Sequence, residues 1–146
     1  MTKVPGYNYG KPYKFRALEV FSSSEWMVDS KRKYRRVFDR SEINYLRFEF
    51  SFYNKLFDEE NWNANLTVSV FKIDGSNREE KCKLTDNKNI PKDQNVIYFN
   101  KSWGVDKYGG YWEEGTYLVI AYIDNVEIGQ KEIYIHNFGV VNQTFN

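Results

Sequence analysis

The chemistry open to this sequence begins with one histidine and one cysteine, His136 and Cys82. A catalytic triad would have to be built on His136, because nucleophilic catalysis needs a base beside the nucleophile. We interpret His136 instead as a partly exposed residue at the end of a strand, and Cys82 as a small buried hydrophobe. The sequence has no cysteine pair, no histidine pair and no glycine-rich phosphate loop. We therefore expect neither a metal nor a cofactor.

Two acidic groups could supply the paired carboxylates of a glycoside hydrolase. They are Asp58-Glu59-Glu60 and Glu113-Glu114, and such a pair would have to flank a glycosidic bond as general acid and as base or nucleophile. Acidic doublets on loops are far more often solvated surface. We therefore expect no enzyme activity, and an enzyme with a loop carboxylate pair is only the third hypothesis.

The run 31–36 is densely basic, with Tyr34 in its middle. Its basic side chains could bind the phosphates of a nucleic acid while Tyr34 stacks on a base. It could also be an edge segment whose charges prevent pairing with another chain. The chain has 21 basic and 20 acidic residues, whereas nucleic-acid-binding domains usually carry a net basic footprint. We favour the edge interpretation and expect no nucleic acid as a partner.

The segment 103–112 concentrates four aromatic residues on a glycine-rich stretch. Exposed aromatic residues on loops form hot spots for proteins or platforms for sugars. Trp103 and Trp112 could instead plug one end of the domain, and we favour burial for this pair because large apolar side chains are mostly buried. We expect Tyr108 and Tyr111 to be exposed. The predicted binding residues are therefore Tyr108 and Tyr111, with Trp103 and Trp112 holding the base of the loop.

These residues must be positioned by strands, because apolar and polar residues alternate along much of the chain. In the segment 46–52, one leucine and three phenylalanines alternate with Arg47, Glu49 and Ser51. This period of two predicts a strand with one buried and one solvent-exposed face. Strands are predicted at 13–21, 36–39, 43–53, 66–73, 79–84, 95–103, 116–123 and 126–135. The predicted core comprises Leu46, Phe48, Phe50, Leu66, Val68, Val70, Tyr117 and Val119.

The connections carry the usual residues of turns. Asp74-Gly75 and Asp124-Asn125 predict tight turns, and the polar stretch 86–93, which contains Pro91, predicts a loop. The segment 22–25 has a capping-box pattern. The following residues, 26–34, are compatible with either a short helix or an irregular edge.

Seven or eight short strands with turns between them predict an all-β sandwich or barrel. Gly115 and Tyr117, at the start of the penultimate strand, favour an immunoglobulin-like antiparallel β-sandwich, because a tyrosine there closes a corner between its sheets. We expect a lead-in segment at 1–12, the sandwich domain at 13–137 and a loose tail at 138–146.

The composition favours a reducing compartment. The 146 residues match one ordinary domain. A single cysteine permits no internal disulfide, which is unusual for a small secreted domain. We find no signal peptide in the first ten residues and no segment long and apolar enough to span a membrane. We therefore expect a cytoplasmic protein.

Two blocks of the sequence resemble a known family. The segments 25–60 and 111–124 are similar to the amino-terminal accessory region of bacterial AAA-type ATPases, in which β-sandwich modules precede the ATPase module. The resemblance implies a cytoplasmic protein that recruits or positions something for an ATP-driven machine. This chain has no Walker motif, so the resemblance assigns no catalytic residue to it.

The first hypothesis is therefore a non-catalytic protein-interaction or accessory module, forming the N-terminal part of an AAA-type ATPase. Its partner is a protein, which the sequence does not identify. The alternative is a carbohydrate-binding module that uses the aromatic segment 103–112.

Overall fold

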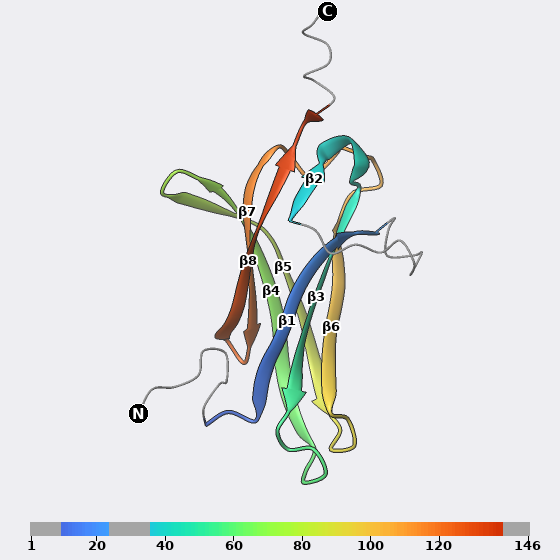
Figure 1. Cartoon of the computed structure of the whole chain (residues 1–146), viewed down its shortest axis with the longest axis vertical. Coiled ribbons are helices and arrows are strands. Elements are labelled where there is room, and N and C mark those ends of the chain that lie inside the picture. The colour runs from blue at the N-terminus through green and yellow to red at the C-terminus, as the bar shows by residue number, and fades with distance from the viewer. Residues whose placement is uncertain (1–9, 24–35, 139–146) are drawn as a thin grey trace, which may run out of the picture.

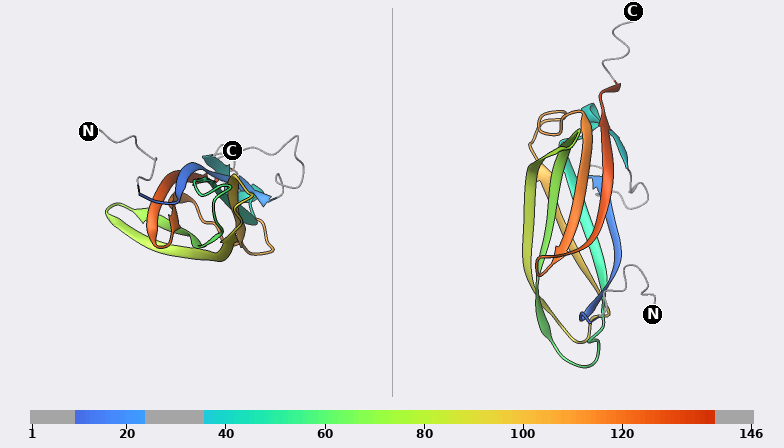
Figure 2. Two further views of the ribbon diagram at one scale, coloured as in Figure 1. Left: turned by 90° about the horizontal axis from the view of Figure 1, so that it is seen from below. Right: turned by 90° about the vertical axis from the view of Figure 1, so that its left-hand side faces the viewer.

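The computed structural model describes residues 10–23 and 36–138, which form an elongated sandwich of two β-sheets (Figures 1 and 2). These residues form eight strands, within the seven or eight that the sequence predicts, and a short 3₁₀ turn, η2 (Arg40–Glu42), follows the second of them. The strands are β1 (Tyr13–Ser22), β2 (Val37–Asp39), β3 (Tyr45–Asn54), β4 (Trp62–Asp74), β5 (Asn77–Ile90), β6 (Val96–Gly104), β7 (Gly115–Ile123) and β8 (Val126–His136).

The strands form a three-stranded sheet in the order β1-β3-β6 and a five-stranded sheet in the order β2-β8-β7-β4-β5. The chain passes between the two layers repeatedly, as in an immunoglobulin-like sandwich. Neighbouring strands are antiparallel except that β2 runs parallel to β8. The predicted immunoglobulin-like β-sandwich is confirmed, and β2–β8 is its one parallel pair among the described strands. The three-residue strand β2 joins the edge of the second sheet after the chain has crossed from β1.

The core lies between the two sheets and consists largely of alternate residues of the long strands. All eight residues predicted for the core are 0% exposed, which confirms the prediction. Phe50 stacks on Phe99 with ring centroids 5.0 Å apart. Each large side chain removed from water in this way contributes about 1.5–3 kcal/mol to folding.

The predicted tyrosine corner is present at the start of β7. The phenol of Tyr117 is buried and donates a 2.7 Å hydrogen bond to the backbone carbonyl of Glu113, four residues earlier. Burial raises the pKa of Tyr117 well above its ordinary value. This contact fixes the direction in which the chain enters β7 from the aromatic segment.

The polar stretch 86–93 is not the loop that the sequence predicts, because β5 continues to Ile90. Strand β5 extends this far because its neighbour β4 is also long, and the two strands remain paired as far as Trp62, which lies opposite Ile90. Asn87 and Asn89 face outward, so the strand needs no apolar residue at those positions. Pro91, which has no N–H to donate, follows directly after the strand ends.

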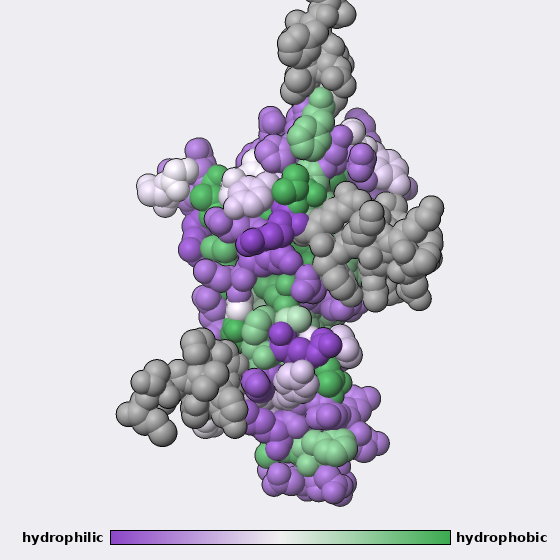
Figure 3. Space-filling model, viewed as in Figure 1, coloured by the Kyte–Doolittle hydropathy of each residue, from purple (hydrophilic) through white to green (hydrophobic). Residues whose placement is uncertain are grey.

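The viewed side of the molecule is largely hydrophilic, with small separate hydrophobic areas (Figure 3). The segment 26–34, the capping-box pattern beyond Ser23 and most of the basic run 31–36 lie outside the described residues. From that run the structure describes Arg36, whose side chain is exposed and whose carbonyl accepts a 2.7 Å hydrogen bond from the backbone N–H of Tyr134.

Candidate functional site

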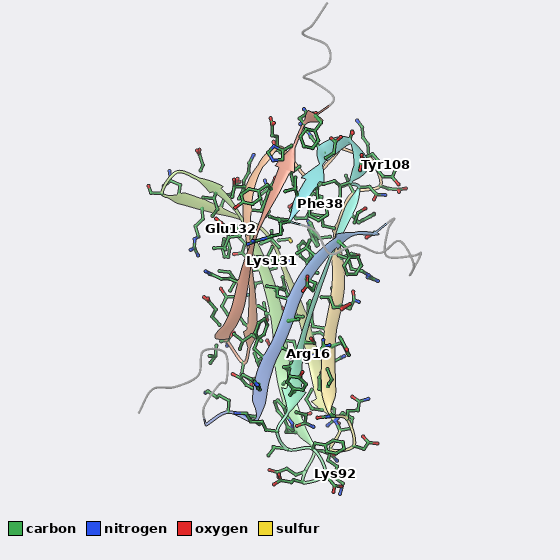
Figure 4. The ribbon with its side chains drawn as sticks, in the orientation of Figure 1. Arg16, Phe38, Lys92, Tyr108, Lys131 and Glu132 are labelled. Atoms are coloured by element: carbon green, nitrogen blue, oxygen red, sulfur yellow. The ribbon has the colours of Figure 1, made fainter. Side chains whose placement is uncertain are left out.

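The aromatic segment 103–112 lies at one end of the sandwich, where the chain crosses from β6 to β7. Figure 4 shows Tyr108 at this end beside η2, and Lys92 at the opposite end of the molecule. Trp103 and Val105 are each 40% exposed, and Tyr108 is 54% exposed. We call these three side chains the aromatic tip. The prediction that Tyr108 is exposed is confirmed.

The backbone at Gly109, next to Tyr108 of the aromatic tip, is hydrogen-bonded to residues of the neighbouring turn η2 and just after it. The N–H of Gly109 donates a 2.8 Å hydrogen bond to the carbonyl of Ile43, and Nε of Arg40 donates a 3.2 Å bond to the carbonyl of Gly109. Gly109 has a φ of +73°, which glycine adopts without steric cost. These contacts fix the backbone next to Tyr108, while the side chain of Tyr108 stays exposed to solvent.

Tyr111 has a structural role, and the prediction that it is exposed is wrong. Its ring is partly buried and packs against the core, and its hydroxyl donates a hydrogen bond to the backbone carbonyl of Lys81 on β5. The ammonium group of Lys81 lies 5.8 Å from the centre of the ring. Tyr111 thus ties the loop to the edge of the five-stranded sheet.

Trp103 is not buried, and the prediction that both tryptophans plug the sandwich is wrong for this one. Trp103 is the next-to-last residue of β6, at the end of the sandwich, whereas Phe99 on the same face of the same strand is buried. Trp112 confirms the prediction. It is 0% exposed, packs against Phe48 and Tyr117, and donates a 3.0 Å hydrogen bond from Nε1 to the carbonyl of Trp103.

Glu113, one of the acidic residues beside the loop, forms ion pairs with two lysines. Glu113 lies 3.4 Å from Nζ of Lys72 and 3.8 Å from Nζ of Lys81. The hydrogen bond and charge of Lys72, and then the charge of Lys81, lower the pKa of Glu113. A general acid in glycoside hydrolysis needs a raised pKa, so the shift runs opposite to that role.

Cys82 and His136 lie where the sequence predicts them. Cys82 is 6% exposed, and burial, followed by the charge of Glu80, raises its pKa to about 12. A thiol with such a pKa is a poor nucleophile at neutral pH. His136 is exposed at the end of β8, where its ring stacks on Phe138. Within residues 10–23 and 36–138 no group of three or more His, Cys, Asp or Glu residues could hold a metal ion.

A second candidate site, which the sequence reasoning missed, lies on the outer face of the five-stranded sheet. Thr67 and Ser69 lie on this face because Leu66, Val68 and Val70 point into the core. They line a hollow of about 240 Å³ together with Phe71, Glu80, Lys83, Tyr122 and Asn125. The alternation of asparagine, threonine and serine along 63–69 was the available signal, since it predicts a continuous polar face.

A further hollow of about 360 Å³ involves the asparagine residues of β4 and β5. Its lining comprises Asn63, Ala64, Asn65, Asn87, Lys88, Asn89 and Asp124. The hydroxyl of Thr67 donates a 3.1 Å hydrogen bond to Oδ1 of Asn65, so the two hollows adjoin. We call them together the polar trough.

No protein-family model and no curated protein sequence matches this chain. Solved structures are similar to it at the level of the fold. One is the alkylpurine DNA glycosylase AlkC of Pseudomonas fluorescens, bound to DNA containing an abasic site analogue, with a TM-score of 0.56 and 9% identity. The match covers 87% of this chain and 31% of the glycosylase chain.

Two further similar structures are the C-terminal domain of wzt and a β-glucosidase. The wzt domain has a TM-score of 0.56 and 11% identity, over 92% of this chain and 83% of that domain. The β-glucosidase EmGH1 of Erythrobacter marinus has a TM-score of 0.52 and 12% identity, over 85% of this chain and 15% of its own. This chain thus spans less than a third of the glycosylase and of the glucosidase. At such identities the similarity shows the fold alone.

The part of the chain that the structure describes contains no helix long and apolar enough to cross a membrane.

Proposed function

We propose that this domain is a non-catalytic accessory module that binds a protein partner through the aromatic tip. The observation that carries the proposal is the combination of exposed apolar side chains with a held backbone. Trp103, Val105 and Tyr108 are 40–54% exposed, while hydrogen bonds to Ile43 and from Arg40 hold the backbone at Gly109. A surface that is already ordered loses little conformational entropy on binding, and aromatic anchors supply much of the energy of protein interfaces.

The proposed setting is the amino-terminal part of a bacterial AAA-type ATPase, where the module would present a protein to the ATPase in the cytoplasm. The support for this setting is the sequence resemblance of the segments 25–60 and 111–124. Similar sandwiches also form parts of larger chains, since the match covers 31% of the AlkC chain and 15% of the glucosidase chain. In this proposal the ATPase chemistry belongs to a separate module and the sandwich contributes only binding.

The aromatic segment 103–112 is poorly arranged for the alternative function, the stacking of a sugar. The rings of Trp103 and Tyr111 meet edge to face at 75°, and those of Tyr111 and Trp112 at 78°. Lys81 approaches the ring of Tyr111, which leaves less of its face open. Rings that meet edge to face do not form one flat platform. This geometry favours a protein as the partner of the tip.

The test is site-specific photo-crosslinking in the native host. The photo-reactive residue p-benzoylphenylalanine is placed at Tyr108, and separately at Tyr98, which is 45% exposed on β6. Position 108 should crosslink to a discrete protein that contains, or co-purifies with, a Walker-type ATPase. Position 98 should give no such product. Equal crosslinking at both positions, or none at position 108, would refute the proposed surface.

A further inference from the structure

The polar trough suggests a second binding surface, on a different face from the aromatic tip. We infer that the trough, formed on the outer side of β7, β4 and β5, binds a neutral oligosaccharide. The inference rests on the shape of this sheet face, its hydrogen-bonding groups and its charge balance. It does not depend on the proposed partner of the tip.

The shape follows from side-chain size along three neighbouring strands. Thr67 lies opposite Tyr122 of β7, and Ser69 lies opposite Lys83 of β5. The small residues of β4 form the floor, and the longer residues of β5 and β7 form the walls. Thr67 and Ser69 are only 4% and 5% exposed although they are on the outside of the sheet. The hollow that they line, about 240 Å³, is smaller than the ~300–1,000 Å³ typical of drug-sized ligands and suits one unit of a longer chain.

The hydrogen-bonding groups of the trough match sugar hydroxyls, which donate and accept at short spacing. The hydroxyl of Ser69 can do both, and so can the amide of Asn125, whereas the hydroxyl of Thr67 donates to Asn65 and can accept from a ligand. Glu80 supplies acceptors, and Lys83 supplies donors. Fixed polar groups of both kinds, placed within one hollow, are what gives a small-molecule site its specificity.

Two aromatic rings line the hollow, and they are not equivalent. The guanidinium of Arg78 lies 5.3 Å from the centre of the Phe71 ring, a distance typical of a cation–π contact. Tyr122 is partly exposed on the other wall. Its ring presents an apolar surface with a polar hydroxyl at the end, which fits the C–H face of a sugar ring beside its hydroxyls.

The charge of the trough argues against the competing ligands. Glu80 and Lys83 carry opposite charges, so this hollow has no net attraction for a phosphate backbone, which needs clustered cations. A groove for an apolar peptide needs apolar pockets, whereas hydroxyls form the floor here. A neutral, hydroxyl-rich ligand fits both observations.

The second hollow extends the same chemistry along β4. Asn65 donates through Nδ2 to Oδ1 of Asn87, and Asn89 donates through Nδ2 to Oδ1 of Asn63, at 3.1 Å. Each amide has two donors and can accept two bonds, so these pairs keep groups available for a ligand. The trough therefore offers adjoining subsites, as expected for an oligosaccharide rather than a single sugar.

The test is a titration of the ¹⁵N-labelled 146-residue chain with neutral oligosaccharides of glucose, xylose, mannose and N-acetylglucosamine, followed by NMR. At least one of them, at millimolar concentration, should shift the amide signals of Thr67, Ser69 and Tyr122. Ser69→Leu fills the hollow and should abolish the shifts. Thr67→Val removes only the hydroxyl from the floor and should weaken binding by about tenfold.

Two control variants separate this surface from its surroundings and from the tip. Thr85 lies opposite Thr67 on β5 but does not line the hollow, so Thr85→Val should bind as the wild type does. Tyr108→Ala should also bind normally. The inference is overturned if none of the oligosaccharides shifts the trough signals, if they shift only signals of the aromatic tip, or if a peptide or an anionic polymer binds the trough in their place. A failure of the oligosaccharides to bind anywhere would leave the crosslinks expected at Tyr108 unaffected, so the two proposals can fail separately.

Discussion

The indole nitrogen of Trp112 donates a 3.0 Å hydrogen bond to the backbone carbonyl of Trp103. The donor ring is fully buried, whereas the ring of Trp103 is 40% exposed. One tryptophan therefore anchors the start of the aromatic segment to the core, and the other belongs to its exposed surface. Substitution of the buried ring should therefore affect stability, and substitution in the exposed tip should affect binding.

We therefore predict that Trp112→Ala lowers the free energy of unfolding by about 3–5 kcal/mol, the usual loss for a large buried aromatic residue. Tyr108→Ala should change it by no more than about 0.5 kcal/mol, because an exposed side chain contributes little to stability. The same Tyr108→Ala variant should weaken binding to the crosslinked partner by about 1 kcal/mol or more. Urea denaturation and a binding titration measure the two effects. A Tyr108→Ala variant as unstable as Trp112→Ala would show that the tip belongs to the core.

The tyrosine corner predicts a second difference between similar residues. Tyr117→Phe removes the hydroxyl that bonds the carbonyl of Glu113, and should lower the free energy of unfolding by about 1–3 kcal/mol because that carbonyl loses its partner. Tyr134→Phe is the matched control, since its hydroxyl donates to the exposed carboxylate of Glu132. The control should lie within about 0.5 kcal/mol of the wild type. Equal losses in the two variants, measured by urea denaturation, would contradict this role for Tyr117.

The centre of the core predicts a large effect at Phe50. Its ring is 0% exposed and stacks on Phe99, so Phe50→Ala should lower the free energy of unfolding by about 3–5 kcal/mol. Phe57→Ala is the control, because Phe57 is 45% exposed in the connection after β3 and should lose no more than about 1 kcal/mol. Chemical denaturation compares them. A loss at Phe50 no larger than at Phe57 would be inconsistent with the packing between the sheets.

Because the pKa of Cys82 is raised, we predict that the free energy of unfolding depends on pH in the alkaline range. Burial, and then the charge of Glu80, raise this pKa from 9.0 to about 12. Between these values the thiol is ionised in the unfolded chain and protonated in the folded one, so the unfolded state binds fewer protons and stability falls as pH rises. The slope from this group is at most about 1.4 kcal/mol per pH unit, and below pH 9 its contribution is constant.

Denaturation of the wild type and of Cys82→Ala across this pH range measures the effect, because other titrating groups are common to both. The difference between the two free energies should shrink above pH 9 and level off near pH 12. Alkylation by iodoacetamide at neutral pH should be slow in the folded protein and fast in urea. Rapid alkylation of the folded protein, or parallel pH profiles of the two variants, would show that the thiol is not protected.

The sequence alone determined which faces of the long strands meet. The alternation from Leu46 to Phe52 requires one buried face, and burying that face stabilises the fold far more than any local preference of these residues. The same reasoning placed Leu66, Val68 and Val70 in the core, and the position of Tyr117 indicated the corner. These features follow from nearest neighbours along the chain, so a period of two was sufficient to find them.

The tertiary structure decided the properties that depend on neighbouring strands. Asn87 and Asn89 belong to a strand because β4 is long enough to pair with them, although their composition is typical of a loop. Trp103 is exposed because β6 reaches the end of the sandwich there, while Tyr111 is partly covered because it reaches the carbonyl of Lys81 on β5. Thr67 lines a hollow only because β5 and β7 supply its walls. Pairing partners and sheet edges are set by contacts between residues far apart in sequence, and a local pattern carries no information about them.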